Sequence, residues 1–224
     1  MIRHIMLFYS NHIKRYLFPH KEEANGSGKN LHYTKIRLAG QDINNIELPL
    51  EERVVAVHHI GLLGYTGGYT AAVYAAGYMP VMADLLKQPS LSDHQRTAVL
   101  EGLSGLCYVH LANQRSAQTL GIHATLQELI DPACPLALSI KVQMWSGYLI
   151  NILCWNNIPL IRILARSDGL RQSLECLESH DWFGWPKNYA RELLYILGFW
   201  EPQTLKRADS RSPAGELCLQ SDSH

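Results

Sequence analysis

The sequence has no surplus of charge of either sign, no paired cysteine motif and no long apolar run at its start. Its 224 residues carry 20 Lys and Arg against 20 Asp and Glu. Proteins that bind nucleic acid usually show a basic excess, so we expect no nucleic-acid partner. The first uninterrupted apolar run, residues 5–9, is too short for the apolar core of a signal peptide.

The five cysteines are an odd number, and no two of them stand in a C-x-x-C arrangement. In a chain of this size, such spacing indicates neither a disulfide framework nor a zinc site. We therefore expect reduced thiols, a cytoplasmic location and no bound metal.

Motifs that carry catalysis or bind cofactors are also missing. The glycine-rich stretch 64–68 lacks the Gly-Lys-Ser/Thr ending of a phosphate loop, and Gly102-Leu103-Ser104-Gly105 falls short of G-x-S-x-G. His58 and His59 are adjacent, so on a helix they point about 100° apart and do not share a face as metal ligands. The sequence therefore predicts a protein that is not an enzyme and that holds no cofactor.

Strand signals are nearly absent, because no sustained alternation of apolar and polar residues occurs. From residue 41 to 200 the apolar residues recur at helical spacing, and 47% of the chain is apolar, which is enough for a sizeable core. Ser92 with Gln95 forms a capping-box signature that predicts a helix over residues 93–110. The fold class indicated is all-α.

Three parts are expected along the chain. Residues 1–40 carry a basic amphipathic helix followed by a flexible linker, residues 41–200 form the helical domain, and residues 201–224 form a disordered tail. The N-terminal helix can dock on the body, bind a partner or lie on a membrane surface, and docking is the interpretation we favour. Residues 142–161 have no formal charge and the length of a membrane span, but their Asn, Gln and Pro residues favour a buried core helix.

Four segments end alike, each with a leucine, a small residue and an aromatic residue. The leucines are Leu63, Leu106, Leu153 and Leu197, and their spacings are 43, 47 and 44 residues. About ten residues before each leucine stands a basic residue; these are Arg53, Arg96, Lys141 and Lys187. A period near 44 is typical of helical repeats, in which neighbouring units stack because one unit alone cannot bury its apolar face.

The stretch Tyr74-Ala75-Ala76-Gly77-Tyr78-Met79-Pro80, followed by Leu85-Leu86, resembles an armadillo repeat. The resemblance covers roughly residues 41–200. It implies a short, right-handed armadillo/HEAT-like solenoid of about four irregular units. The third unit departs from the pattern, since there is no room for a short first helix between Trp155 and Pro159.

The resemblance implies a non-enzymatic interaction or scaffold module with a protein or peptide partner, in an oligomeric state that the sequence leaves open. The alternative is a membrane-associated helical protein, attached through the N-terminal basic helix or through residues 142–161. If that segment packs against neighbouring helices on several sides, the membrane-span interpretation fails.

In peptide-binding armadillo proteins, an asparagine stands where this chain has an aromatic residue in each unit. These aromatic residues are Tyr65, Tyr108, Trp155 and Phe199. They form either an exposed ladder that binds a partner or a set of core wedges. We favour burial, since bulky aromatic residues on a helical stripe are usually buried, and we retain the four as candidate partner-binding residues.

The repeat also generates a stability prediction. Leu106→Ala removes a stacked core contact and should lower the free energy of unfolding by about 2–5 kcal/mol. Thermal unfolding of the variant beside the unsubstituted chain measures the effect. Coincident melting curves would contradict this alignment of the repeats.

Overall fold

The computed structural model of the chain describes residues 28–199, and within that range it contains helices and no strand. The helices are α2 (Gly28–Asn44), α3 (Leu50–Thr66), α4 (Gly68–Ala75), the 3-10 helix η1 (Ala76–Tyr78), α5 (Met79–Leu86), α6 (Asp93–Cys107), α7 (Leu111–Thr119), α8 (Ile122–Ile130), α9 (Ile140–Cys154), α10 (Ile158–Leu164), α11 (Leu170–Glu178) and α12 (Tyr189–Ile196). The predicted all-α class is confirmed for this part of the chain.

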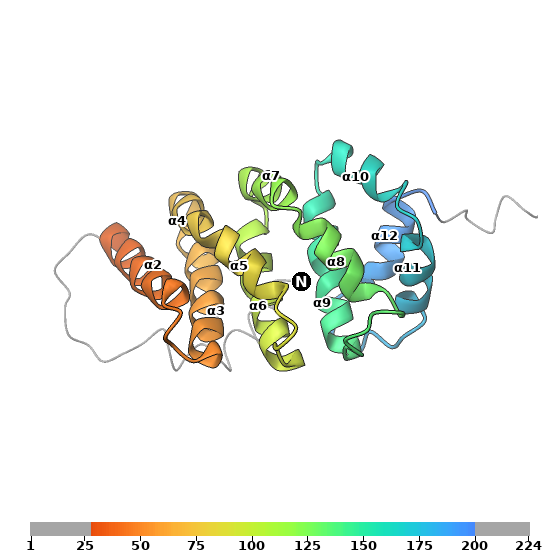
Figure 1. Ribbon diagram of the computed structural model, residues 1–224. Coiled ribbons are helices and arrows are strands. Elements are labelled where there is room, and N and C mark those ends of the chain that lie inside the picture. Colours follow the sequence, from red (N-terminus) through yellow and green to blue (C-terminus); the bar gives the residue numbers. More distant parts are fainter. Residues whose placement is uncertain (1–27, 200–224) are drawn as a thin grey trace, which may run out of the picture.

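The long helices pack in chain order. α3 lies between α2 and α6, α6 packs against α9, and α9 packs against α12. The short helices α4, α7 and α10 lie along one edge of this array, and α5 and α8 pack against α6 and α9 respectively (Figure 1). One buried apolar cluster runs through all of these layers, from Ile36 in α2 to Leu194 in α12.

The capping box at the start of α6 forms as predicted. Ser92 Oγ accepts a hydrogen bond from the Gln95 backbone N–H at 3.3 Å, and Gln95 Oε1 accepts one from the Ser92 N–H at 2.9 Å. The helix ends at Cys107, three residues earlier than predicted. It ends there because Val109 adopts φ 53° and His110 caps α7 by accepting from the Asn113 N–H.

The expected lack of a short helix after Trp155 is wrong, because α10 begins at Ile158. Asn156 turns the chain within one residue at φ 52°, and Asn157 Oδ1 accepts from the Leu160 N–H at 3.3 Å. Val109 and His110 make the same kind of turn before α7. The set α9, α10 and α11 therefore matches the set α6, α7 and α8, and an αL glycine precedes the last helix in both, at Gly121 and Gly169.

The boundary expected between residues 40 and 41 falls inside α2. Ile36, Ala39 and Ile43 of that helix are buried against the body, so residues 28–40 are not a flexible linker. The helix begins at Gly28, the last residue of the Asn-Gly-Ser-Gly stretch on which the linker prediction rested. The expected N-terminal helix and the expected C-terminal tail lie outside the described residues.

Residues 142–161 do not form one helix, since α9 ends at Cys154 and α10 begins four residues later. α9 packs against α6, α8 and α12, and Ser146 Oγ donates to the Val142 carbonyl at 2.9 Å. The core-helix interpretation is confirmed for residues 142–154 only, and the membrane-span interpretation is wrong. No helix between residues 28 and 199 combines the length and the apolar character needed to cross a bilayer.

Two of the four repeated basic residues hold the ends of preceding helices. Arg53 Nε donates to the Ile43 carbonyl at 3.0 Å, and Arg96 Nη1 donates to the Leu86 carbonyl at 2.7 Å. Each bond spans ten residues and supplies a donor to a carbonyl at a helix end, where intrahelical partners run out. At the end of α11 the same role falls to Asn188, which donates to the Glu178 carbonyl at 2.8 Å.

α3 and α6 approach so closely that their backbones touch. A Cβ on Gly61 would overlap the backbone of Gly102, and a Cβ on Gly105 would lie 2.9 Å from the Gly61 carbonyl oxygen. Gly64 similarly leaves room for the Leu106 side chain, whose Cδ2 would be 2.5 Å from an added Cβ. Glycine is required at these positions because a larger side chain would clash with the neighbouring helix, and not because of the backbone conformation.

Gly61→Ala should therefore lower the free energy of unfolding by about 1–3 kcal/mol, because either the backbone of α6 or that of α3 must shift. Gly77→Ala is the matched control, since an added Cβ there meets no atom within 4 Å, and it should change stability by less than about 0.5 kcal/mol. Urea unfolding of both variants measures the difference. Equal stabilities would contradict the backbone contact.

Candidate functional site

Three of the four predicted aromatic residues form a ladder across neighbouring layers. The ring centroids of Tyr65 and Tyr108 are 5.6 Å apart, and those of Tyr108 and Trp155 are also 5.6 Å apart. The side chains of Tyr65 and Trp155 are 38% and 37% exposed, and Tyr108 is half-buried. The favoured core interpretation is therefore wrong for Tyr65 and Trp155, whereas Tyr108 and Phe199 are partly buried and pack against the core.

Phe199 does not join this ladder. It is half-buried and packs against the apolar core, and no ring contact links it to Tyr65, Tyr108 or Trp155. Tyr108 and Trp155 occupy equivalent places, since each follows the last residue of its helix with nearly the same backbone conformation: φ −63° and ψ 120° at the first, φ −61° and ψ 120° at the second. We call Tyr65, Tyr108 and Trp155 the aromatic ladder.

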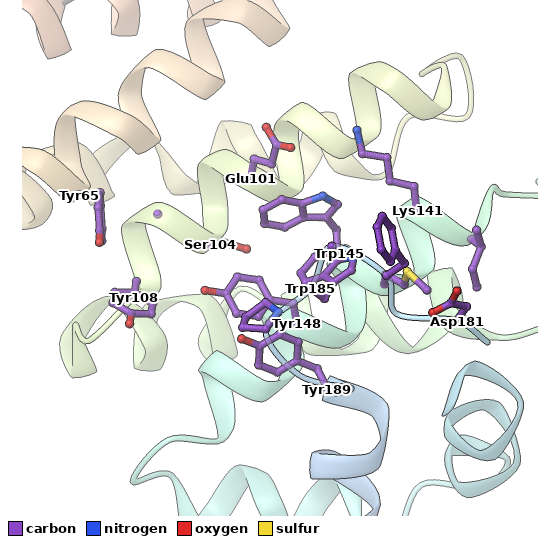
Figure 2. Close-up of a pocket in the computed structure, with 16 residues that line it drawn as sticks. Tyr65, Glu101, Ser104, Tyr108, Lys141, Trp145, Tyr148, Asp181, Trp185 and Tyr189 are labelled. Carbon is purple, nitrogen blue, oxygen red and sulfur yellow. The ribbon is translucent and has the colours of Figure 1, made fainter. Parts of the chain in front are cut away.

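A pocket of about 430 Å³ opens beside the ladder, between α6, α9 and the segment that leads into α12. Figure 2 shows its residues, which come from helices far apart in the sequence. Its aromatic lining consists of Tyr65, Tyr108, Trp145, Tyr148, Phe183, Trp185 and Tyr189. Two ladder rings are therefore shared with the pocket, and the two features form one surface.

The wall of the pocket is held by edge-on contacts between rings. Trp145 and Trp185 have centroids 5.0 Å apart at 68°, and Tyr148 contacts Trp185 at 5.7 Å and Tyr189 at 4.7 Å. Such arrangements are favourable because the positive edge of one ring meets the negative face of another. The neighbouring Trp182 is anchored separately, since its indole N–H donates to the Leu177 carbonyl at 3.1 Å.

These pocket residues, apart from Tyr65 and Tyr108, were not among the predicted site residues. None of Trp145, Tyr148, Trp185 and Tyr189 belongs to the repeated leucine-small-aromatic pattern. A usable signal was nevertheless present, since four aromatic residues gather within residues 182–189, and Trp145 and Tyr148 are spaced to share a helix face.

Ser104 places a hydroxyl group on the floor of the pocket. Its side chain is only 4% exposed, and its Oγ has no hydrogen-bond partner among the described residues. Figure 2 shows this oxygen pointing from α6 toward the rings of the wall. A buried hydroxyl without a partner is costly, so a ligand that pairs with it would gain free energy.

Charged side chains stand around the rings. Glu101, Lys141 and Asp181 line the pocket, and Glu101 Oε2 lies 3.3 Å from His58 Nε2 on α3. The sequence alone indicated no set of titratable residues that converge. In the sequence, Lys141 stood out only as one of the four basic residues that precede the repeated leucines. Within residues 28–199 no three His, Cys, Asp or Glu side chains are placed to hold a metal ion.

The buried phenols of the pocket resist ionisation. Burial raises the pKa of Tyr189 to about 12, with smaller contributions from Tyr108 and Glu192. Burial also raises the pKa of Tyr108, and Tyr65 adds to the effect. Both hydroxyl groups are therefore protonated at neutral pH and can donate hydrogen bonds.

A family model described as armadillo-like helical domain-containing protein 2 matches residues 1–201. No curated protein and no solved structure matches the chain. The matched range includes every described residue, and both the aromatic ladder and the pocket lie within it.

The raised pKa of Tyr189 makes stability depend on pH in a defined direction. An unfolded tyrosine ionises near about pH 10, so the stability from burying the neutral phenol is complete below pH 10 and is lost as pH rises toward 12. Tyr189→Phe should reduce the loss of unfolding free energy between pH 8 and pH 11 by about 1 kcal/mol. Urea unfolding at both pH values tests this, and an unchanged loss would show that the Tyr189 phenol is not buried.

Proposed function

The chain belongs to the family of armadillo-like helical domain-containing protein 2, and from this premise we propose that it is a non-enzymatic scaffold that binds a protein partner. The binding surface consists of the aromatic ladder and the adjoining pocket. The domain itself is armadillo-like and all-helical.

For the arrangement of the helices, we propose a right-handed solenoid of about four irregular units. Hydrogen bonds between equivalent places of neighbouring layers support it. Gln95 Nε2 donates to Glu51 Oε2 across 44 residues of sequence, and the Ser139 N–H donates to Asp93 Oδ2 across 46. These spacings are close to the sequence period, as expected when successive units stack in register.

The observation that carries the binding proposal is the exposure of Phe183 at the rim of the pocket. Its side chain is 92% exposed, although it stands beside a wall of packed rings. It lines the same pocket as Tyr65 and Tyr108 of the aromatic ladder, and exposed aromatic side chains gathered around one pocket are typical of protein interfaces. Aromatic residues near the centre of an interface supply most of the binding energy.

The arrangement of charges supports binding over catalysis. Glu101 is engaged with His58, and the exposed Lys141 and Asp181 stand at the edge of an aromatic pocket. A general acid or base needs a reacting atom within hydrogen-bond reach, whereas an interface needs shape and apolar contact. We therefore propose a role in assembly and no reaction.

To test this proposal, a photoreactive phenylalanine analogue is placed at position 183 of the full chain, and at position 195 in a matched control. Tyr195 is 71% exposed on α12 and does not line the pocket. Covalent capture from native tissue identifies the partner, and calorimetry with the purified partner then measures its affinity for the variants.

Phe183→Ser should weaken the affinity by about tenfold or more, as expected for an aromatic hot spot. Tyr195→Ser should leave it within about twofold. Equal affinities of the two variants, or equal capture at both positions, would place the partner elsewhere and contradict the proposal.

A further inference from the structure

We infer that the pocket takes an arginine side chain of the partner protein, which it recognises through the guanidinium group. This inference rests on the proposed function, because it names what the partner inserts. Three independent features of the pocket agree on this chemistry: its aromatic faces, the unpartnered Ser104 hydroxyl and the carboxylates in its lining.

The aromatic faces favour a planar cation. Trp145, Tyr148 and Trp185 meet edge to face, with centroids between 5.0 and 5.7 Å apart. The negative face of each ring attracts a cation, and tryptophan does so most strongly. A guanidinium group is planar and stacks on such rings, whereas the strongly hydrated ammonium of lysine does so less well.

The unpartnered Ser104 hydroxyl favours a ligand that can form a hydrogen bond with it. Its oxygen is buried on the floor of the pocket and has no partner between residues 28 and 199. A proline or leucine side chain in the pocket would leave this oxygen without a partner, so it would gain no hydrogen bond there. A guanidinium N–H donates directly to Ser104 Oγ and leaves its remaining donors for other acceptors.

The charges of the lining complement a cation. The pocket is lined by two carboxylates, Glu101 and Asp181, and by one ammonium group, that of Lys141. Figure 2 shows the Lys141 nitrogen pointing away from Asp181, and no ion pair joins the two. The Asp181 carboxylate therefore adds to the attraction of the pocket for a cation, while the guanidinium group itself pairs with Ser104 Oγ.

The size and position of the pocket suit a side chain that arrives on a polypeptide. Its volume of about 430 Å³ lies within the range of sites that enclose a small group. The aromatic ladder continues from it through Tyr65 and Tyr108, so the backbone that flanks the arginine would lie along these rings.

The test uses the full chain labelled with ¹⁵N, with the indole N–H signals of Trp145 and Trp185 assigned through Trp145→Phe and Trp185→Phe. The probe is N-acetyl-arginine amide. The comparison compounds are N-acetyl-citrulline amide, which has the same shape without the charge, and the peptide triproline. The arginine derivative should give saturable shifts of both signals, with a Kd at least about tenfold lower than that of the citrulline derivative.

Charge variants then test the role of the rim. Asp181→Asn should raise the Kd of the arginine derivative by about two- to fivefold, and Lys141→Gln should lower it by a similar factor, as expected for partly exposed charges. Asp168→Asn is the matched control, because that exposed carboxylate lies before α11 and outside the pocket; it should leave the Kd unchanged.

Ser104→Ala should raise the same Kd by about three- to tenfold without lowering stability, since it removes a hydroxyl that has no hydrogen-bond partner within residues 28–199. Unchanged urea unfolding of this variant shows that its fold is intact.

Equal affinity for the arginine and citrulline derivatives would overturn the inference. So would shifts caused by triproline alone, or no shifts with any probe. If Phe183→Ser abolishes partner binding while the arginine derivative causes no shift, the arginine inference fails and the proposed function stands. If the arginine derivative binds but Phe183→Ser leaves partner affinity unchanged, the proposed function fails.

Discussion

The contact between the backbones of α3 and α6 constrains the arrangement of the aromatic ladder. Gly61 and Gly102 carry no side chains, so the two helices approach more closely than any larger residue would permit. The aromatic residues at the ends of these helices, Tyr65 and Tyr108, then lie with their ring centroids 5.6 Å apart. An interior contact that serves packing thus sets the spacing of two rings at the surface.

Buried polar groups hold the layers to one another. Arg96 is 1% exposed and donates to the carbonyls of Leu86 and Gln88 at distances of 2.7 and 3.1 Å. Burial lowers the pKa of its guanidinium group, which nevertheless stays protonated because its ordinary pKa is so high. Asn113 acts between layers in a similar way, since its Nδ2 donates to the Ala72 carbonyl at 3.1 Å and to the Leu106 carbonyl at 2.8 Å. Helix ends that would otherwise leave carbonyls unpaired are thereby fixed in position.

Sequence reasoning could predict the features that depend on local pattern. The all-helical class, the capping box at Ser92 and the positions of Tyr65, Tyr108 and Trp155 all follow from spacing along the chain. It could not predict the exposure of these rings, because period alone does not say which face of a helix a neighbour covers. The pocket was missed for a related reason, since Trp185 and Tyr189 meet Trp145 and Tyr148 only through tertiary packing. The short helix α10 was missed because a residue in the left-handed region, Asn156, shortens the turn beyond what spacing suggests.

The account therefore depends most on the distance between α3 and α6. Nuclear Overhauser spectroscopy on the chain labelled with ¹³C-glycine measures this distance through the Hα protons of Gly61 and Gly102. A strong cross-peak between these two residues is the result that the close approach requires. If that cross-peak is missing in a folded sample whose glycine signals are assigned, the helices are separated by intervening side chains and the basis of the aromatic ladder is lost.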